Sequence, residues 1–278
     1  MSTPTTEPVV TGVALPAAPA PGPMEARFRD LRASGRKLLV PYLTGGLGPW
    51  TEHIRAMADA GADAIEVGIP FSDPAMDGPV IQQASELALR QGTTPGTVFA
   101  ALRDVDAGVP LVAMTYYNLA FHMGDERFAG ELAEAGFSGM ILPDVPLEEQ
   151  GPWRAAAEPA GIETTLMVGP ITPDDRLAAV CAASRGYVYG VNLMGITGER
   201  VDIGAQGAAL ARRVKAVTDL PVLMGFGVST PEQAVEVSRE ADGAIVGTAI
   251  VRRILDGGTP LELHAYVSTL RAALDQAS

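Results

Sequence analysis

The chain has 278 residues, and 47% of them are hydrophobic, which is enough to bury the core of one large α/β domain or of two small ones. Acidic residues (33) outnumber basic ones (20), and the formal net charge of −13 argues against binding to nucleic acid or an anionic membrane, since both need a basic surface. The single cysteine, Cys181, excludes an internal disulfide, and no apolar run approaches the ~20 residues of a membrane span, so we expect a cytoplasmic protein.

The first 23 residues are rich in Pro, Ala and Thr and contain no Lys or Arg. A secretory signal would begin with basic residues and continue with an apolar core, so residues 1–23 are predicted to form a disordered tail. The folded domain is predicted to span residues 24–278 and to begin with an extra helix over 24–34.

From Leu38 onward one pattern repeats: a short continuous apolar run, a break rich in Gly, Pro or Asp, and an amphipathic stretch. Continuous apolar runs are typical of parallel strands buried on both faces. The eight predicted strands are 38–44, 64–68, 111–116, 139–142, 164–168, 187–191, 222–225 and 244–246. The predicted helices between and after them are 50–60, 80–90, 95–103, 126–135, 147–160, 174–183, 208–217, 231–240 and 260–274.

Eight strand–helix units without a linker predict a single-domain (β/α)₈ TIM barrel. The alternative is an open doubly wound sheet, which usually has fewer strands and a glycine-rich turn after the first strand. The turn over residues 44–49 lacks the glycine spacing of a dinucleotide-binding site, so the pattern favours the barrel.

Polar residues at the ends of the strands indicate where the chemistry lies, because barrel enzymes place their active sites there. Glu66 interrupts the apolar second strand, and the loop after it carries Ser72, Asp73 and Asp77. Glu66 and Asp77 are predicted to form an acid/base pair, with a raised pKa for the carboxyl inside the barrel and an ordinary pKa for the one in a solvated loop. Alternatively, Glu66 faces outward or pairs with an arginine, and Asp77 only favours the start of a helix.

Glycines follow the last three strands, at Gly195 and Gly198, at Gly225 and Gly227, and at Gly247 before Thr248. Glycines let backbone N–H groups approach an anion, so we expect a phosphate site there; ordinary tight turns are the alternative. On the sixth strand, Tyr187 and Tyr189 share one face, and Tyr189 is expected to reach the mouth because it lies nearer the strand end.

From about Met24 to the last helix the sequence resembles the tryptophan synthase alpha subunit family. The resemblance is carried by six motifs, at 66–79, 116–118, 142–146, 195–198, 225–229 and 242–248. The first motif is highly specific, whereas the glycine pairs alone would not identify a family.

The resemblance implies retro-aldol cleavage of indole-3-glycerol phosphate to indole and glyceraldehyde 3-phosphate. It implies that Glu66 is the acid/base at the reacting carbon and that Asp77 accepts the indole N–H. The implied indole slot consists of Tyr42, Met114, Ile141, Met167, Tyr189, Phe226 and Ile245. The implied phosphate site consists of Gly198, Gly227, Gly247 and Thr248, and Thr197 is expected on a mobile loop that closes over the site.

The resemblance also implies a partner, a pyridoxal-phosphate-dependent beta subunit in an α₂β₂ heterotetramer, with Pro70 and Asp73 on the docking loop. The pyridoxal phosphate is expected on the partner, and this chain is expected to carry no cofactor. No metal is expected either, because the three histidines lie far apart and form no i, i+4 pair. The sequence departs from the family pattern at Leu47, where a carboxylate is common, and at Thr248, where serine is usual.

Three alternatives remain open on the sequence. One is a stand-alone lyase that releases free indole, which the altered loop at Leu47 allows. Another is a non-catalytic subunit that only activates a beta partner, although both carboxylates are present. The last is a different phosphate-binding barrel, such as a sugar-phosphate isomerase or an aldolase, but the strand interiors contain no lysine for a Schiff base.

Overall fold

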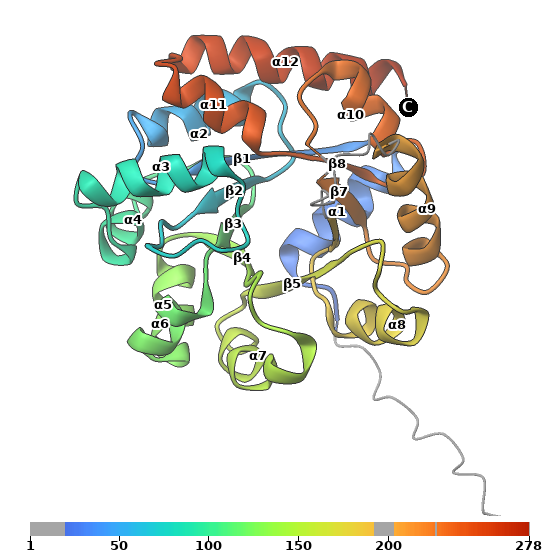
Figure 1. Ribbon diagram of the computed structural model, residues 1–278, viewed down its shortest axis with the longest axis horizontal. Helices are drawn as coiled ribbons and strands as arrows, with labels where there is room; N and C mark the ends of the chain where they lie inside the picture. Colours follow the sequence, from blue (N-terminus) through green and yellow to red (C-terminus); the bar gives the residue numbers. More distant parts are fainter. Residues whose placement is uncertain (1–19, 192–202, 226, 278) are drawn as a thin grey trace, which may run out of the picture.

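The computed structural model describes residues 20–191, 203–225 and 227–277. In this part of the chain, eight parallel strands form a closed barrel in which each strand pairs with the next and the last pairs with the first. Helices surround the barrel, as Figure 1 shows in a view along its axis. The predicted (β/α)₈ barrel is therefore confirmed.

The strands are β1 (Leu38–Thr44), β2 (Ile65–Gly68), β3 (Leu111–Met114), β4 (Phe137–Ile141), β5 (Glu163–Val168), β6 (Val188–Val191), β7 (Val222–Gly225) and β8 (Gly243–Val246). The helices are α1 (Pro23–Ala33), α2 (Trp50–Asp59), α3 (Pro79–Arg90), α4 (Pro95–Leu102), α5 (Tyr117–Met123), α6 (Asp125–Glu134), η1 (Leu147–Glu149), α7 (Gly151–Ala157), α8 (Asp174–Ala183), α9 (Ile203–Lys215), α10 (Pro231–Ser238), α11 (Thr248–Leu255) and α12 (Pro260–Gln276). None of these helices combines the length and the apolar character needed to cross a bilayer.

Alternate residues of each strand serve two apolar cores. On β1, Leu38 and Val40 join the cluster inside the barrel, whereas Leu39 and Leu43 join the cluster between strands and helices. All seven residues of β1 are buried because a parallel strand in a barrel is covered on both faces. The continuous apolar runs in the sequence have this cause.

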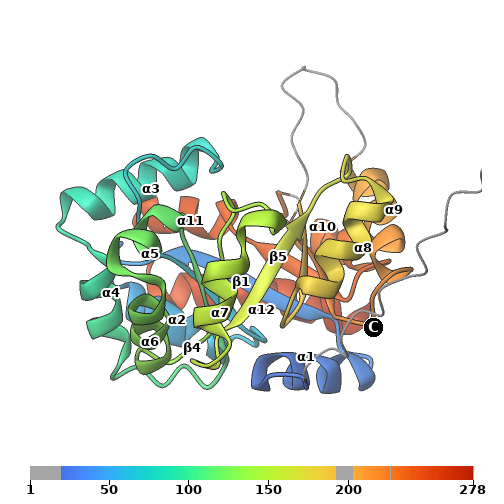
Figure 2. The same ribbon diagram turned by 90° about the horizontal axis from the view of Figure 1, so that it is seen from below.

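Helix α1 lies across the end of the barrel where the strands begin (Figure 2), and its Met24 and Phe28 are fully buried in the inner core. Its N-terminus has no side-chain cap of its own. Instead, the buried carboxylate of Glu163 at the start of β5 accepts the backbone N–H groups of Met24 and Glu25, at 2.8 and 3.0 Å. Burial raises the pKa of Glu163 to about 7, against the opposing effect of these two hydrogen bonds. Glu163 thus connects α1 to the end of the barrel where the strands begin.

Several element boundaries differ from the predictions. The third strand ends at Met114 and not at Tyr116, and helix α5, which was not predicted, follows it. The first N–H group of α5, that of Tyr117, donates to the carboxylate of Asp144. Helix α11 was also not predicted, because it follows β8 after Gly247 alone and no polar break separates their apolar residues. The predicted helix over 147–160 is divided into η1 and α7 at Gln150.

Candidate active site at the barrel mouth

Glu66 lies on β2 with its side chain inside the barrel and no exposed surface. Its Oε1 accepts the hydroxyl proton of Tyr187 at 2.6 Å, and its Oε2 has no hydrogen-bond partner among the described residues. Burial raises the pKa of Glu66 to about 8, and the hydrogen bond from Tyr187 acts in the opposite direction. The carboxyl group is therefore mainly protonated at neutral pH and can lose its proton close to it, which suits an acid/base.

Tyr187 is a contact of the site that sequence reasoning missed. It precedes β6, lies deeper than Tyr189, and is fully buried in the inner core against Phe28, with ring centroids 5.8 Å apart. The alternation of Tyr187 and Tyr189 predicted only that both rings share one face. The contact of the Tyr187 hydroxyl with Glu66 on β2 depends on closure of the sheet.

Asp77 lies near the end of the loop between β2 and α3, just before the N-cap Gly78, and is only partly exposed. Burial raises its pKa, while Tyr116 lowers it by donating its hydroxyl to Oδ2 at 3.0 Å. The prediction of an ordinary pKa for a solvated Asp77 is therefore wrong. Tyr116 also accepts the N–H of Met76 at 2.8 Å and stacks on Phe71, so it holds both ends of the loop that carries Asp77.

The charges of Glu66 and Asp77 both affect the pKa values of the same two tyrosines, Tyr42 and Tyr189. Tyr42 pairs in register with Glu66 on the neighbouring strand and therefore points to the same side of the sheet. Burial raises the pKa values of Tyr42 and Tyr189 most, and the charges of both Glu66 and Asp77 add to the increase in each. Glu66 and Asp77 thus face a common space at the mouth of the barrel.

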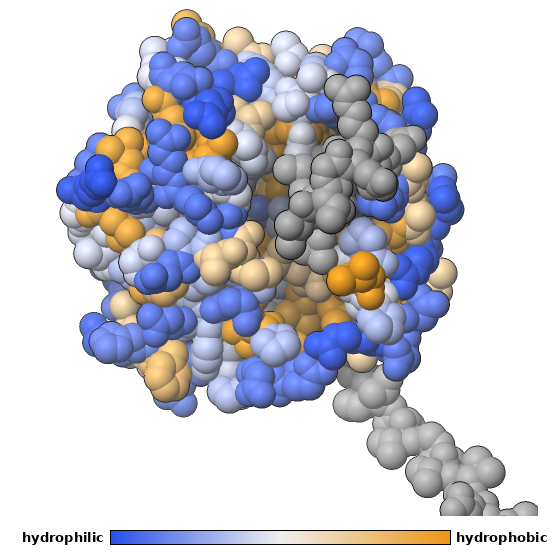
Figure 3. Space-filling view, viewed as in Figure 1, coloured by the Kyte–Doolittle hydropathy of each residue, from blue (hydrophilic) through white to orange (hydrophobic). Residues whose placement is uncertain are grey.

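Apolar side chains surround that space. Met114 and Ile141 are the last residues of β3 and β4 and pair in register, as do Met167 and Tyr189 on β5 and β6. Together with Ile245 on β8, all of them belong to or pack against the inner core. Figure 3 shows this face of the molecule, with a hollow at the centre of the barrel and apolar surface beside it. A flat, apolar ligand fits such a lining.

The glycines after β7 and β8 lie at the same end of the barrel. Gly247 is the N-cap of α11 without a side-chain hydrogen bond, and Thr248 begins that helix with its side chain exposed. An uncapped helix N-terminus presents backbone N–H groups to an anion. Gly227 is exposed and has a φ of 64°, which only glycine adopts readily. A Cβ on Gly247 would lie 3.7 Å from that of Tyr42, so this candidate anion site borders the apolar slot.

Three residues expected in the site, Thr197, Gly198 and Phe226, lie outside the described residues. At the departure from the family pattern, Leu47 is 3% exposed and packs in the core around the barrel, between Gly46 and Gly48, which both have positive φ. The loop after β1 thus uses Leu47 for packing.

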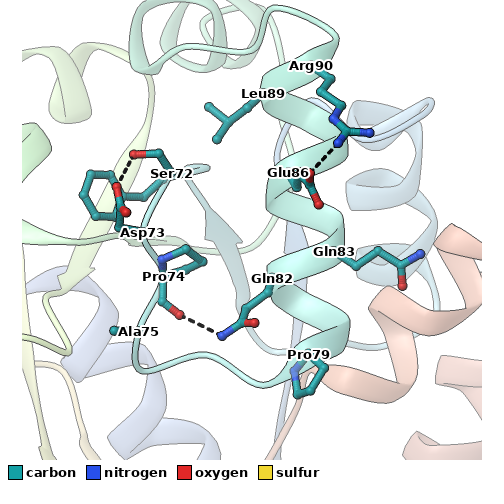
Figure 4. A pocket seen from close by; sticks show the side chains of 11 residues that line it. Ser72, Asp73, Pro74, Ala75, Pro79, Gln82, Gln83, Glu86, Leu89 and Arg90 are labelled. Carbon is teal, nitrogen blue, oxygen red and sulfur yellow. Dashed lines mark hydrogen bonds and ion pairs between the residues drawn. The ribbon is translucent and has the colours of Figure 1, made fainter.

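The expected docking loop forms one wall of a cavity of about 740 Å³ between residues 71–75 and α3. Figure 4 shows Asp73 on the loop side, with its carboxylate accepting the Ser72 hydroxyl at 2.6 Å, and Gln82 of α3 reaching the carbonyl of Pro74. Pro70 precedes this wall and is buried, whereas Asp73 is exposed.

In the described part of the chain, no group of three or more His, Cys, Asp or Glu side chains is placed to hold a metal ion.

A closed parallel barrel with two carboxyls and open glycine turns at the C-terminal ends of its strands defines the class of TIM-barrel enzymes that act on small anionic substrates. The family model for the tryptophan synthase alpha chain matches residues 28–273. The chain belongs to this family, whose reaction is the cleavage of indole-3-glycerol phosphate, a lyase reaction.

Individual relatives agree with the family model. The tryptophan synthase alpha chain of Streptomyces coelicolor is 46% identical over 230 residues, which cover 81% of this chain and 85% of that one. That of Thermobifida fusca is 46% identical over 240 residues, covering 84% and 89%. Among solved structures, tryptophan synthase of Mycobacterium tuberculosis superposes with a TM-score of 0.84 at 39% identity, covering 92% of this chain and 99% of that one. The tryptophan synthase alpha subunit of Legionella pneumophila superposes with a TM-score of 0.85 at 33% identity, covering 92% and 100%.

Proposed function

We propose that this chain cleaves indole-3-glycerol phosphate to indole and glyceraldehyde 3-phosphate, with Glu66 and Asp77 as its catalytic residues. The observation that carries the proposal is that buried Glu66 inside the barrel and Asp77 in the loop after its strand accompany an apolar slot and an uncapped helix N-terminus at the same end of the barrel. The slot accommodates the indole ring, and the start of α11 with Gly227 accommodates the phosphate.

In this mechanism Glu66 delivers a proton to indole C3 and takes one from the side-chain hydroxyl as the C–C bond breaks. Its pKa of about 8 allows both roles near neutral pH, because neither the acid nor the carboxylate is rare there. Asp77 accepts the indole N–H and stabilises the cationic indolenine-like state. The hydrogen bond from Tyr116 favours the ionised form of Asp77 that this role requires.

The first test is indole release from indole-3-glycerol phosphate by the purified chain and by its Glu66→Gln and Asp77→Asn variants. We expect Glu66→Gln to lower kcat about 10²- to 10⁴-fold, because one proton transfer is typically worth that much. A Thr269→Ala variant on the outer helix α12 serves as the matched control. Near-normal turnover of the Glu66→Gln variant would refute the assignment.

The tryptophan synthase alpha family normally works with a beta subunit. We propose that this chain does the same in an α₂β₂ tetramer, that pyridoxal phosphate is bound only by the beta subunit, and that this chain carries no cofactor. Exposed side chains near the docking loop support the docking surface: Asp73 on the loop itself, Met76 (60% exposed) and Phe121 of α5 (70% exposed). The hydrogen bond from the Met76 amide to Tyr116 connects the loop to the residue preceding α5.

Mixing the chain with a tryptophan synthase beta subunit tests the partner. We expect a tetramer by analytical ultracentrifugation, faster indole release than from the chain alone, and weaker association of an Asp73→Lys variant. Equal activity with and without the beta subunit, together with no association, would instead favour the stand-alone lyase. No cleavage in either setting would favour the non-catalytic subunit.

A cytoplasmic location is also proposed, and cell fractionation tests it.

A further inference from the structure

Tyr266 on the outer helix α12 contacts two separate elements that lead to the mouth of the barrel. Its hydroxyl donates to the backbone carbonyl of Ser229, at 3.0 Å, in the loop between β7 and α10. Its ring lies under the guanidinium group of Arg253 on α11, with the carbon of that group 3.5 Å from the ring centroid. Burial raises the pKa of Tyr266, so the hydroxyl keeps its proton and serves as a donor.

Among the described residues, Tyr266 is the only hydrogen-bond donor to this carbonyl. The side chain of Gln233 accepts the N–H and hydroxyl of Ser229 and the N–H of Thr230, which fixes the loop to the start of α10. Val228 is buried, and Gly227 beyond it is exposed with positive φ. The side chain of Gln233 therefore binds the N–H and hydroxyl donors of this loop. The hydroxyl of Tyr266 binds the backbone carbonyl of Ser229, two residues after Gly227.

Arg253 provides the second connection. It lies in the last turn of α11, donates to the carbonyl of Ala249 one turn earlier, and is only partly exposed. Helix α11 has eight residues, so a restraint at its last turn also orients its first turn, which begins at Thr248. A cation held against an aromatic ring at a partly desolvated site is worth more than a surface ion pair.

We propose that Tyr266 is a positioning residue that sets the spacing between the two elements of the phosphate site, the turn at Gly227 and the start of helix α11 at Thr248. This inference rests on the proposed function, because it concerns the same anion site. Tyr266 acts from outside the barrel and touches neither the substrate nor the carboxyls. It therefore governs affinity for the phosphate end of the substrate and leaves proton transfer unchanged.

The test compares Tyr266→Phe, which removes only the hydrogen bond to Ser229, with Arg253→Gln, which removes the cation over the ring. Thr269→Ala is the matched control, because it removes from the same helix a hydroxyl that donates, among the described residues, to the backbone carbonyl of Tyr266 and not to its side chain. Each variant is compared with the unchanged chain in kcat and KM for indole-3-glycerol phosphate and in calorimetric binding of glycerol 3-phosphate and of indole. Thermal unfolding shows that each variant is folded.

We expect Tyr266→Phe and Arg253→Gln to raise both KM and the Kd for glycerol 3-phosphate roughly three- to ten-fold, with kcat within two-fold and indole binding unchanged. The control should match the unchanged chain. Unaltered KM and Kd in both variants, or equal losses in phosphate and indole binding, would overturn the inference, as would absence of glycerol 3-phosphate binding to the unchanged chain. If the unchanged chain binds the phosphate but does not cleave the substrate, the proposed function fails while the binding data still decide the role of Tyr266.

Discussion

At the scale of single residues, Tyr187 regulates the proton affinity of Glu66. Its hydroxyl is the only hydrogen-bond donor to the Glu66 carboxyl among the described residues, and it stabilises the ionised form. The remaining environment is apolar and favours the neutral form. The balance between one hydrogen bond and full burial sets a pKa of about 8.

Replacing Tyr187 with Phe should raise the pKa of Glu66 further, because the ionised carboxyl loses its donor. The limb of the pH profile of kcat/KM that reports Glu66 should move to higher pH by roughly one to two units, which corresponds to the net free energy of a hydrogen bond to a charged group. The profile of the free enzyme is the measurement. A Tyr117→Phe variant, which loses a tyrosine–carboxylate bond to Asp125 away from the site, should leave the profile in place.

At the scale of elements, α1 is held to the barrel by a carboxyl from β5. The helix supplies Met24 and Phe28 to the inner core, but Gly22 cannot cap its first N–H groups. The buried Glu163 caps them from a distance of 139 residues along the chain. Neighbouring glycines make room for this arrangement, since a Cβ on Gly186 would lie 2.4 Å from Cε of Met24.

Glu163→Ala should lower the free energy of unfolding by about 1–3 kcal/mol, because two buried N–H groups lose their acceptor. Glu163→Gln should cost less, since one carbonyl oxygen remains. Urea denaturation at pH 7 measures both. The matched control is Glu262→Gln, which removes charge from an exposed cap at the start of α12. If Glu163→Ala is no more destabilising than that control, the cap does not hold α1.

At the scale of the whole molecule, Glu66 and Glu163 make stability depend on pH. Their folded-state pKa values, about 8 and about 7, lie above the ordinary value of 4.5, so the folded chain binds more protons than the unfolded one. Stability from these groups is therefore complete below about pH 4.5 and is lost as the pH rises through 7 and 8. His53 acts oppositely below about pH 6.5, because burial lowers its pKa.

The free energy of unfolding should fall by about 1 kcal/mol between pH 7 and pH 8, mostly through Glu66. Urea titrations at several pH values measure the slope. A Glu66→Gln/Glu163→Gln double variant should show a flat dependence in this window, since neither amide titrates. A slope that persists in the double variant would assign the effect to other groups.

The barrel, a functional Glu66 in the second strand and the resemblance to the family could be predicted, because they follow from local patterns in the sequence. The raised pKa of Asp77 was not predicted, because its loop looks solvated in the sequence, whereas in the fold Asp77 is partly buried and lies against Tyr116. Tyr187 and Glu163 were missed for the same reason. Their partners are 121 and 138–139 residues away along the chain, and no local pattern encodes such a contact.

The sequence by itself determined the strand–helix alternation, because burial of parallel strands on both faces requires continuous apolar runs. It also determined the chemical groups available at the strand ends. Only the tertiary structure decided which of these groups meet. Closure of the barrel brings β2 opposite β6 and places β8 beside β1, and this sets both the environment of Glu66 and the position of Gly247 next to Tyr42. A carboxyl becomes an acid/base at neutral pH only through such an environment, since burial rather than residue type shifts its pKa.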